Sequence, residues 1–457
     1  MTRARVAAIA FSLCAAISAT AGAHGGLPVS QRILRKGNDA TLFVPVVFWG
    51  VWVGGDGKPW RWICEELMNG NRNRRIALST DGTFYATDLR GLTLSLDEGC
   101  TWTAAQGELA NRRVTDVIND PVDGATAYAS TGDSPDPDAD GGVGGDNGVW
   151  VTHDHGANFT RVSGLLSQKE RLFETVRIAP SDPKVLYAGS VLAGGTFSPV
   201  VHRSDDVGVT FNNYPLTYLL DGVQPFSLEV LAVDPRDPKV VYLRVFASAS
   251  TDAGDVGRQA LLRSHDGGAT FAELLKMDGV YAPSGMARGI DGVAIDTTRN
   301  KVLVATAIGL YSGDDAGSAA SVTLTHLDAL SQAQCVDVHE GTVLACSNNY
   351  QPDNAAIARS DDGAQTFQSI LRYYDTEGPI DCPKGTPVGD QCPLYWSMYG
   401  SQLGIDFSDG GLPVRDAGVD GPQPTGCACD LGAAPLSLGG LLLLLPGLLL
   451  ILRRRRA

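Results

Sequence analysis

The chain has 457 residues, a formal net charge of -15 and 54 glycines. An acidic surface of this kind repels phosphate backbones, which excludes nucleic acid as an expected partner. The many glycines, with no long amphipathic stretch, favour an all-β chain over a helical one.

The first 23 residues are predicted to be a signal peptide. Arg3 and Arg5 give a positive start, residues 6–19 are mostly apolar, and residues 21–23 (AGA) form a small-residue cleavage site. The apolar run is too short to cross a bilayer comfortably, which disfavours a retained membrane helix. We therefore expect the export machinery as a partner and a mature chain that begins at His24.

An eight-residue motif, S/T-x-D-x-G-x-T-W/F, recurs along the chain; we call it the turn motif. Five recognisable copies begin at 95, 152, 204, 264 and 360, and two degenerate copies begin at 53 and 312. Seven units at spacings of 42 to 60 residues, each long enough for a four-stranded sheet, predict a seven-bladed β-propeller of antiparallel blades. The residues that define the copies are Ser95, Asp97, Gly99, Trp102, Thr152, Asp154, Gly156, Phe159, Ser204, Asp206, Gly208, Phe211, Ser264, Asp266, Gly268, Phe271, Ser360, Asp362 and Phe367.

Several units open with two segments of strand composition joined by Pro- and Asp-rich turns. These pairs are 176–180 with 184–188, 230–234 with 239–243, and 293–295 with 301–306. A unit is therefore predicted as strand, turn, strand, loop, third strand, turn motif and fourth strand. How the ring closes is open from the sequence, and the segment 40–48 is a candidate for joining the last blade.

The turn motif suits a tight turn whose backbone N–H groups need partners. A Ser or Thr hydroxyl and an Asp carboxylate can supply them, and Gly permits a left-handed backbone angle. The motif resembles the Asp-box, or BNR repeat, of sialidases and related propellers, over about residues 40–408. That resemblance implies a place on the outer rim, between the third and fourth strands of a blade, and a structural role for the aspartates.

Six cysteines lie between the signal peptide and the tail: Cys64, Cys100, Cys335, Cys346, Cys382 and Cys392. Export permits disulfides, and an even number suits three of them among fifteen possible pairings. A hairpin turn at Glu340-Gly341 would place Cys335 directly opposite Cys346. A local loop between Cys382 and Cys392 is then expected, and Cys64 with Cys100 follows by elimination.

The sialidase resemblance implies three substrate-binding arginines, one in an F/Y-R-I-P motif, with a Tyr/Glu nucleophile and an Asp acid/base. This sequence has no such motif: Arg32 and Arg35 lack it, and Arg177 stands in VRIAP, already explained as a strand. Tyr373 and Tyr374 are not tied to a Glu or to an arginine triad. We therefore name no catalytic residue.

Another glycosidase is the alternative. The xyloglucan-degrading Asp-box enzymes place two carboxylates across a cleft between two propellers, and this chain is long enough for one propeller. Its many carboxylates leave a catalytic pair open, but the sequence identifies none.

Three further clusters have a structural and a functional interpretation. Asp136, Asp138 and Asp140 match the D-x-D-x-D-G opening of a calcium loop, but the twelfth position is Asn147 rather than Glu. We favour a polar insertion there, with a weak calcium site as the alternative. His153 and His155 could bind a metal ion but are expected to face solvent. Tyr395, Trp396 and Tyr399, in a predicted last strand, could stack on a sugar but are expected to pack in the core or at the rim.

The end of the chain has four features in order. Residues 409–426 have a Gly, Asp and Pro-rich linker composition, Cys427 and Cys429 follow, then Leu431 to Leu452 without a charge, then Arg453 to Arg456. The uncharged run is long enough to span a bilayer, and the arginines place its end in the cytoplasm. The order resembles the MYXO-CTERM sorting tail of myxobacterial surface proteins. This implies cleavage by a sorting protease, with Cys427 or Cys429 as the processing or lipid-attachment position; an ordinary membrane anchor is the alternative.

These observations predict a signal peptide (1–23), a propeller (24–408), a linker (409–426) and a sorting tail (427–457). We expect an exported, non-catalytic surface module that recognises a protein or a polysaccharide, with a glycan-active hydrolase and a calcium-dependent adhesin as alternatives. No cofactor is expected apart from the weak calcium candidate.

Overall fold

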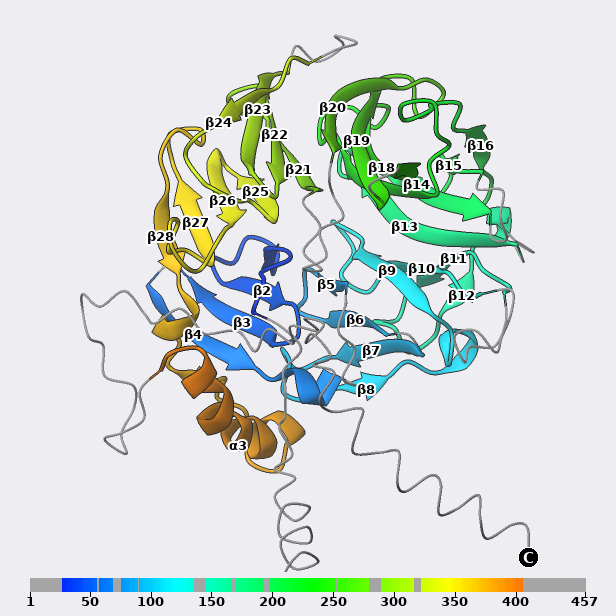
Figure 1. Cartoon of the computed structure of the whole chain (residues 1–457). Coiled ribbons are helices and arrows are strands. Elements are labelled where there is room, and N and C mark those ends of the chain that lie inside the picture. Colours follow the sequence, from blue (N-terminus) through cyan, green and yellow to red (C-terminus); the bar gives the residue numbers. More distant parts are fainter. Residues whose placement is uncertain are drawn as a thin grey trace, which may run out of the picture. The chain divides into compact units, whose positions relative to one another are not determined.

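The computed structural model describes residues 27–405, apart from 56, 69–74, 89, 135–144, 166–169, 193–197, 252–253, 279–288 and 316–321. The described residues form seven sheets arranged as the blades of a propeller (Figure 1), which confirms the predicted fold class. Within these ranges no helix is both long and apolar enough to cross a membrane. The predicted signal peptide, linker, Cys427, Cys429 and membrane span all lie outside the described residues, as do Asp136, Asp138 and Asp140.

Each blade takes consecutive strands. They are β1 (Leu34–Arg35), β2 (Leu42–Val46), β3 (Gly50–Gly55) and β4 (Lys58–Ile63) in blade 1; β5 (Ile76–Leu78), β6 (Phe84–Asp88), β7 (Gly91–Ser95) and β8 (Thr103–Ala104) in blade 2; β9 (Val114–Asn119), β10 (Ala127–Thr131), β11 (Val149–Thr152) and β12 (Thr160–Arg161) in blade 3; β13 (Arg171–Ala179), β14 (Asp182–Leu192), β15 (Val200–Ser204) and β16 (Asn212–Pro215) in blade 4; β17 (Ser227–Val233), β18 (Val241–Thr251), β19 (Gly254–Ser264) and β20 (Ala272–Asp278) in blade 5; β21 (Ile290–Asp296), β22 (Lys301–Thr306), β23 (Gly309–Asp314) and β24 (Thr325–Leu327) in blade 6; and β25 (Cys335–His339), β26 (Thr342–Cys346), β27 (Ile357–Ser360) and β28 (Gln368–Leu371) in blade 7. Shorter elements are the 3₁₀ turns η1 (Glu65–Met68), η2 (Gly107–Leu109), η3 (Ser163–Leu165) and η4 (Tyr373–Asp375), strand β29 (Gly378–Pro379) and helix α3 (Pro387–Gln402).

The first two strands of blades 4, 5 and 6 are the strand pairs expected from the sequence. Antiparallel pairing joins β13 to β14, β17 to β18, and β21 to β22. All five recognisable turn motifs begin at the last residue of a third strand and end before a fourth strand. The order of elements predicted for a unit is therefore the order found.

The five turn motifs share one pattern of hydrogen bonds. The hydroxyl of the first residue accepts the N–H four residues later, at 2.8 Å for Gly268 to Ser264 and 2.9 Å for Ala364 to Ser360. The aspartate accepts both the backbone N–H and the hydroxyl of Thr270, at 2.9 and 2.6 Å, in the copy of Asp266. The glycine position has positive φ in all five copies, from 85° to 99° for the glycines and 69° for Ala364. The left-handed angle expected from the glycine is thus present, even where alanine replaces it.

Turns of neighbouring blades also contact one another. In blades 1, 2, 5 and 6, the turn between the first and second strands reaches the third-to-fourth-strand turn of the next blade. The contacts are Lys36 with Glu98 at 2.5 Å, Asp81 with His155 at 2.9 Å, Arg236 with Asp315, and the Arg299 guanidinium with the carbonyl oxygen of Asp361 at 2.9 Å. These polar links tie successive blades together at one end of their strands.

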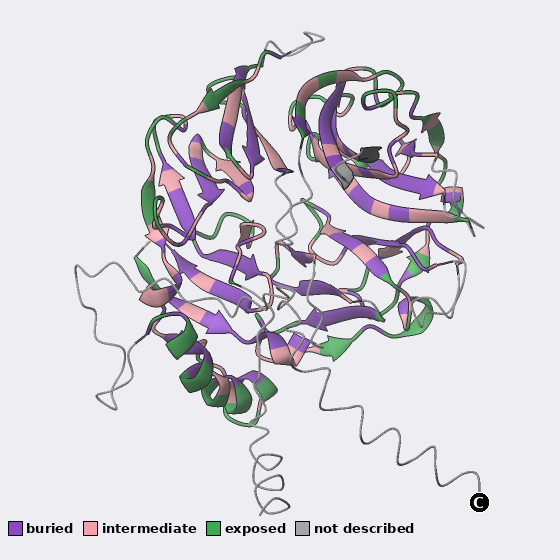
Figure 2. Ribbon diagram, viewed as in Figure 1, coloured by how far each residue is buried: buried purple, intermediate pink, exposed green. Residues whose placement is uncertain are grey.

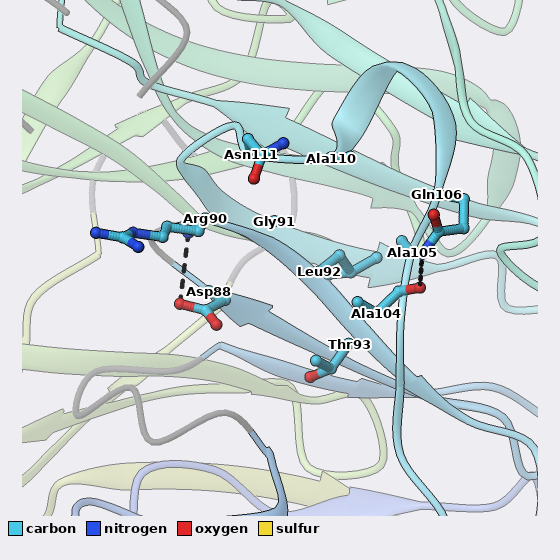
Figure 3. A pocket seen from close by; sticks show the side chains of 10 residues that line it. All are labelled: Asp88, Arg90, Gly91, Leu92, Thr93, Ala104, Ala105, Gln106, Ala110 and Asn111. Atoms are coloured by element: carbon cyan, nitrogen blue, oxygen red, sulfur yellow. Dashed lines mark hydrogen bonds between the residues drawn. The ribbon is translucent and has the colours of Figure 1, made fainter. Parts of the chain in front are cut away.

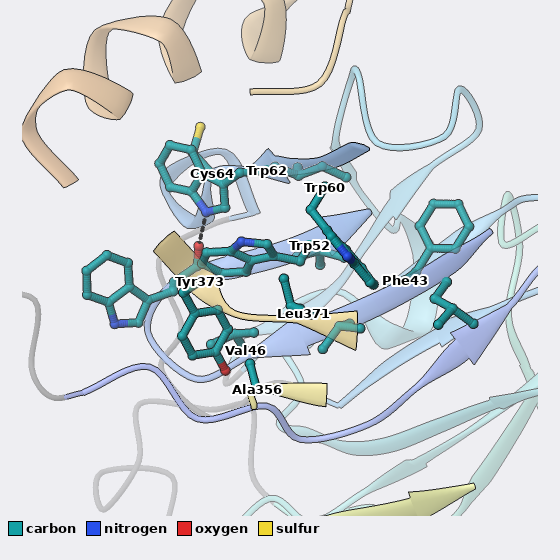
Figure 4. Packing of buried hydrophobic residues seen from close by; sticks show 14 of the residues in the cluster. Phe43, Val46, Trp52, Trp60, Trp62, Cys64, Ala356, Leu371 and Tyr373 are labelled. Atoms are coloured by element: carbon teal, nitrogen blue, oxygen red, sulfur yellow. Dashed lines mark hydrogen bonds between the residues drawn. The ribbon is translucent and has the colours of Figure 1, made fainter. Parts of the chain in front are cut away.

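Buried residues occur in the strands of every blade (Figure 2), and the hydrophobic core lies between the blades rather than within one central body. Separate buried clusters join blades 2 and 3, 3 and 4, 4 and 5, 5 and 6, and 6 and 7. The largest cluster joins blade 7, blade 1, blade 2 and α3, and Figure 4 shows Trp52, Trp62 and Tyr373 within it. The Trp52 ring lies 6.4 Å from the Trp62 ring and 5.0 Å from the Tyr373 ring, and Tyr373 also shares a 2.7 Å hydrogen bond with Ser30. Burial of both faces of each sheet explains why a single blade would not be stable alone.

The ring closes differently from the expectation. Segment 40–48 does not join the last blade, because β2 pairs with β1 and β3 inside blade 1. Instead, β29 from the C-terminal side adds a parallel fifth strand to the outer edge of β4. Blade 1 therefore holds both ends of the described chain together.

Helix α3 replaces the last strand predicted around Tyr395. Thr386 caps its start by accepting the N–H of Gly389 at 3.1 Å, and Pro387 occupies its first turn, both of which favour a helix. Cys392, Trp396 and Tyr399 then recur on one buried face, which packs on blade 1. Trp396 and Tyr399 are thus core residues of a helix, and the partly buried Tyr395 packs against the same cluster, which confirms the packing expected and corrects the element.

Three disulfides link the six described cysteines. Cys335 pairs with Cys346 across the β25–β26 hairpin, as predicted. The other two predicted pairings are wrong: Cys64 bonds Cys392, and Cys100 bonds Cys382. Elimination failed because it assumed a local loop, whereas α3 returns the chain to blade 1. Both long-range disulfides therefore fasten the C-terminal segment to blades 1 and 2.

Candidate functional site

The first strands of neighbouring blades lie side by side, as β9 and β13, β13 and β17, and β21 and β25 do, and charged side chains meet there. In several of these strands a charged residue interrupts an apolar run, as Glu229 does in SLEVLAV of β17. We call this set the central charged cluster. It consists of Arg32 and Arg35 (blade 1 side), Arg75 (before β5), Asp116 (β9), Glu174 and Arg177 (β13), Glu229 (β17), Arg244 (β18), Asp291 (β21) and Asp337 (β25).

Asp116 is the centre of one half of the cluster. It is fully buried, and it pairs with Arg177 and with Arg32, the latter at 3.6 Å. Burial and the neighbouring charge of Arg177 lower the pKa of Arg32 to about 9. Two arginines that the sequence offered only as poor matches to a substrate site are therefore brought together around one carboxylate. Arg35 lies apart from them and pairs with Asp337 at 3.4 Å.

Glu229 is the centre of the other half. Arg244 lies directly opposite it in the β17–β18 register and forms an ion pair with it. Arg75, from blade 2, reaches across the ring to the same carboxylate at 3.2 Å. Burial alone would raise the pKa of Glu229, but Arg244 and Arg75 lower it to about 2. Glu229 is thus held as a carboxylate.

Two neighbouring carboxyl groups have the opposite tendency. Burial, followed by repulsion from Glu229, raises the pKa of Glu174 to about 7. Burial also raises the pKa of Asp291 to about 7, because Arg244 is 3.9 Å away and compensates only in part. Near neutral pH these groups exchange between a hydrogen-bond donor and an acceptor.

Glu174 is positioned by the next blade. Its Oε2 atom accepts the backbone N–H of Leu228 at 2.6 Å and the hydroxyl of Ser227 at 2.8 Å. Next to this contact, the rings of Phe226 and Phe246 meet edge to face at 4.8 Å, and both side chains are partly exposed. This region around Phe226, Phe246 and Glu174, the inner end of blade 5, therefore combines aromatic surface with charged groups that reach solvent.

The remaining predicted residues do not converge on this cluster. Tyr373 is buried against Trp52, and Tyr374 lies under the Arg372 guanidinium, 4.8 Å from its ring centroid. His155 pairs with Asp81, while His153 contacts the Thr126 hydroxyl at 2.8 Å. Among the described residues, no group of three or more His, Cys, Asp or Glu side chains is arranged to hold a metal ion.

A hydrogen-bonded chain in blade 4 has the residue types of a nucleophile site. Ser190 Oγ lies 2.7 Å from Nε2 of His202, whose Nδ1 lies 2.6 Å from Asn213 Oδ1. Burial lowers the pKa of His202 to about 4, which keeps the ring neutral. Ser190 and His202 are both buried, so a substrate cannot meet the hydroxyl, and we assign the chain a structural role.

A pocket lies beside β7 (Figure 3). Asp88, Arg90, Gln106 and Asn111 are among its lining residues. The Asp88 carboxylate accepts the N–H of Arg90 at 3.4 Å, and Asp88 is the only carboxylate among the described residues that line the pocket. These residues give no acid and base pair.

Sequence reasoning missed seven members of the cluster: Arg75, Asp116, Glu174, Glu229, Arg244, Asp291 and Asp337. The available signal was a charged residue inside an otherwise apolar first strand, repeated from unit to unit: Glu174 after Phe173, Glu229 between Leu228 and Val230, and Asp291 after Ile290. A charged side chain is costly to bury in the apolar core between two blades. It therefore lies where the first strand borders water, at the centre of the propeller.

No protein-family model and no curated protein matches the chain. Among solved structures, the GH74 xyloglucanase from Xanthomonas campestris aligns at 14% identity and a TM-score of 0.37, over 78% of this chain and 66% of that enzyme. The GH74 enzyme of Niastella koreensis aligns at 14% identity and a TM-score of 0.31, over 74% of this chain and 71% of that one. Sqt1 of Saccharomyces cerevisiae aligns at 11% identity and a TM-score of 0.46, over 75% and 84%. At these values the similarities bear on neither activity nor ligand.

Proposed function

We propose that this chain is a non-catalytic recognition module of an exported surface protein, which binds a polysaccharide or protein ligand through the end of the propeller around its central charged cluster. The observation that carries the proposal is the state of Glu229. Its carboxylate is held between Arg75 and Arg244, with a pKa lowered to about 2. A carboxylate whose charge is compensated by two arginines, with its pKa lowered in this way, is a weak base. A fixed set of paired charges instead suits recognition.

The surface location is part of the same proposal. Three disulfides in the described chain suit an oxidising compartment. The signal peptide and the tail with Cys427, Cys429 and the apolar span support export followed by anchoring. Mass spectrometry of the surface protein tests this part: loss of residues 431–457 supports sorting, and an intact tail contradicts it.

The binding proposal is tested with the purified mature protein on an array of immobilised glycans and surface proteins, with and without calcium. Binding without turnover of fluorogenic glycosides supports a recognition module. Dependence on calcium would favour an adhesin that uses the segment with Asp136, Asp138 and Asp140. Absence of binding to any glycan or surface protein would contradict the proposal.

A glycoside hydrolase is the second candidate, because two neighbouring carboxyl groups have pKa values pushed apart. Glu174, with a pKa of about 7, would give its proton to the leaving oxygen, and Glu229, with a pKa of about 2, would stabilise positive charge at the sugar carbon. This candidate predicts turnover of a glycoside by the wild-type protein and at least a hundredfold slower turnover by Glu174→Gln.

A further inference from the structure

The inner end of blade 5 carries an aromatic pair directly beside charged groups. Phe226 donates its N–H to the carbonyl oxygen of Phe246 at 2.9 Å, and their rings meet at 77°. In the register, Ser227 stands opposite Phe246 and Glu229 opposite Arg244. Because alternate residues of a strand share a face, Phe246 and Arg244 lie on the same face of β18, one pleat apart.

The polar groups around this pair have capacity for a further partner. The two hydrogen bonds to Glu174 both use Oε2. Among the described residues none hydrogen-bonds to Oε1, so this oxygen is available to a ligand. Asp291 is 28% exposed and only 3.9 Å from its nearest arginine, and Arg75 is 34% exposed. Donors and acceptors therefore reach solvent within one small region, where Ser227, Glu229 and Arg244 connect them.

The charge balance of this region selects the ligand. Three carboxyl groups, Glu174, Glu229 and Asp291, stand against two guanidinium groups, Arg75 and Arg244. Because the pKa values of Glu174 and Asp291 are about 7, these two groups are about half charged near neutral pH, and the total carboxyl charge roughly balances that of Arg75 and Arg244. A region without net charge gives a charged ligand no net attraction, so an uncharged ligand is favoured. Carboxyl and guanidinium groups bind hydroxyl pairs well, and an aromatic face packs on the C–H face of a sugar ring.

We propose that Phe246, Glu174 and Asp291 form a subsite for an uncharged, hydroxyl-rich polysaccharide at the inner end of blade 5. Phe226 and Phe246 supply the apolar surface, and the carboxyl groups and Arg75 orient the hydroxyl groups. The inference rests on the proposed recognition function and narrows its ligand to one chemical class. It assigns no catalytic step.

The experiment is isothermal titration calorimetry of the full-length protein in detergent. The probes are uncharged hexasaccharides of β-glucan, xylan, mannan and α-glucan, beside the anionic hexamer of galacturonate. Phe246→Ala and Asp291→Asn are compared with Tyr395→Ala, which removes a partly exposed aromatic ring from the distant helix α3. A thermal melt of each variant verifies that it is folded.

We expect at least one uncharged probe to bind the wild-type protein. Its Kd should be about tenfold higher for Phe246→Ala and for Asp291→Asn and unchanged for Tyr395→Ala. Binding of uncharged probes that neither substitution weakens would overturn the subsite while leaving the recognition function intact. Binding of galacturonate alone, or of proteins alone, would overturn the ligand class. If Phe246→Ala does not fold, Asp291→Asn decides by the same criterion.

Discussion

At the residue scale, Glu174 and Asp291 differ from most carboxyl groups in retaining protons near neutral pH. Their pKa values are about 7 in the folded chain, because burial disfavours their charge and Glu229 lies nearby. Between the unfolded pKa values, 4.5 for Glu174 and 3.8 for Asp291, and the folded values near 7, these two groups bind more protons in the folded state than in the unfolded state. By linkage, the free energy of unfolding falls as pH rises through this window.

Substituting Glu174 isolates this effect. The stability advantage of the wild type over Glu174→Gln should shrink by up to about 3 kcal/mol between pH 4.5 and 8, since the glutamine has no proton to lose. Urea denaturation at half-unit pH steps measures this difference in the free energy of unfolding. Protonation of His202 changes stability in the opposite direction, but equally in both proteins, so it cancels from the difference. A difference that stays constant or grows with pH would show that Glu174 ionises normally.

Asp266 represents the residues that hold the turn motifs. It accepts bonds from Ser264, from the N–H of Thr270 and from the Thr270 hydroxyl, at 2.6 to 2.9 Å. Asp266→Ala should lower the free energy of unfolding by about 1–3 kcal/mol, because the turn loses its acceptors. Asp328→Ala, at a fully exposed aspartate, is the control and should change it by less than about 0.5 kcal/mol. Equal effects in a thermal melt would mean that the motif has no structural role.

At the scale of elements, β29, α3 and two disulfides close the ring. All strands of blades 2 to 7 lie between Cys64 and Cys392, which are 328 residues apart. Cys335 and Cys346 are only 11 apart. A disulfide that closes a longer loop restricts the unfolded chain more, so the ring-closing pairs should contribute more to stability.

Removing both ring-closing disulfides by alanine at Cys64, Cys100, Cys382 and Cys392 should cost about 5 kcal/mol or more. Removing Cys335–Cys346 in the same way should cost about 3 kcal/mol. Guanidinium denaturation compares the two variants. A larger loss from the hairpin disulfide would mean that the C-terminal segment is not what holds the ring closed.

Local sequence patterns predicted most strands and turns well, but they could not predict which residues far apart in the chain pair with each other. The motif fixes the turn before each fourth strand because its bonds join residues at most four positions apart, as Ser264 and Gly268 are. Alternation and Pro-rich turns likewise predicted β13 with β14. Helix α3 was missed because its three aromatic residues suggested a strand, although Thr386 and Pro387 supplied helix-start signals that could have been used.

At the scale of the whole molecule, repetition at regular spacing predicted seven blades, but it could not predict what meets at the centre. Arg32, Asp116 and Arg177 come from three different blades, and Arg75 reaches Glu229 across the ring. No spacing in the sequence brings these residues together; only closure of the ring does. The same closure paired Cys100 with Cys382, which elimination among local loops had excluded.

Recognition without catalysis leaves a bound glycan intact, so the fate of that glycan tests it. The wild-type protein and Glu174→Gln are incubated for days with the tightest-binding glycan in ¹⁸O-labelled water, and the reducing ends are examined by mass spectrometry. If the protein binds glycans without cleaving them, neither sample incorporates ¹⁸O above the protein-free control. Incorporation by the wild type that Glu174→Gln abolishes would contradict it and make the central charged cluster an active site.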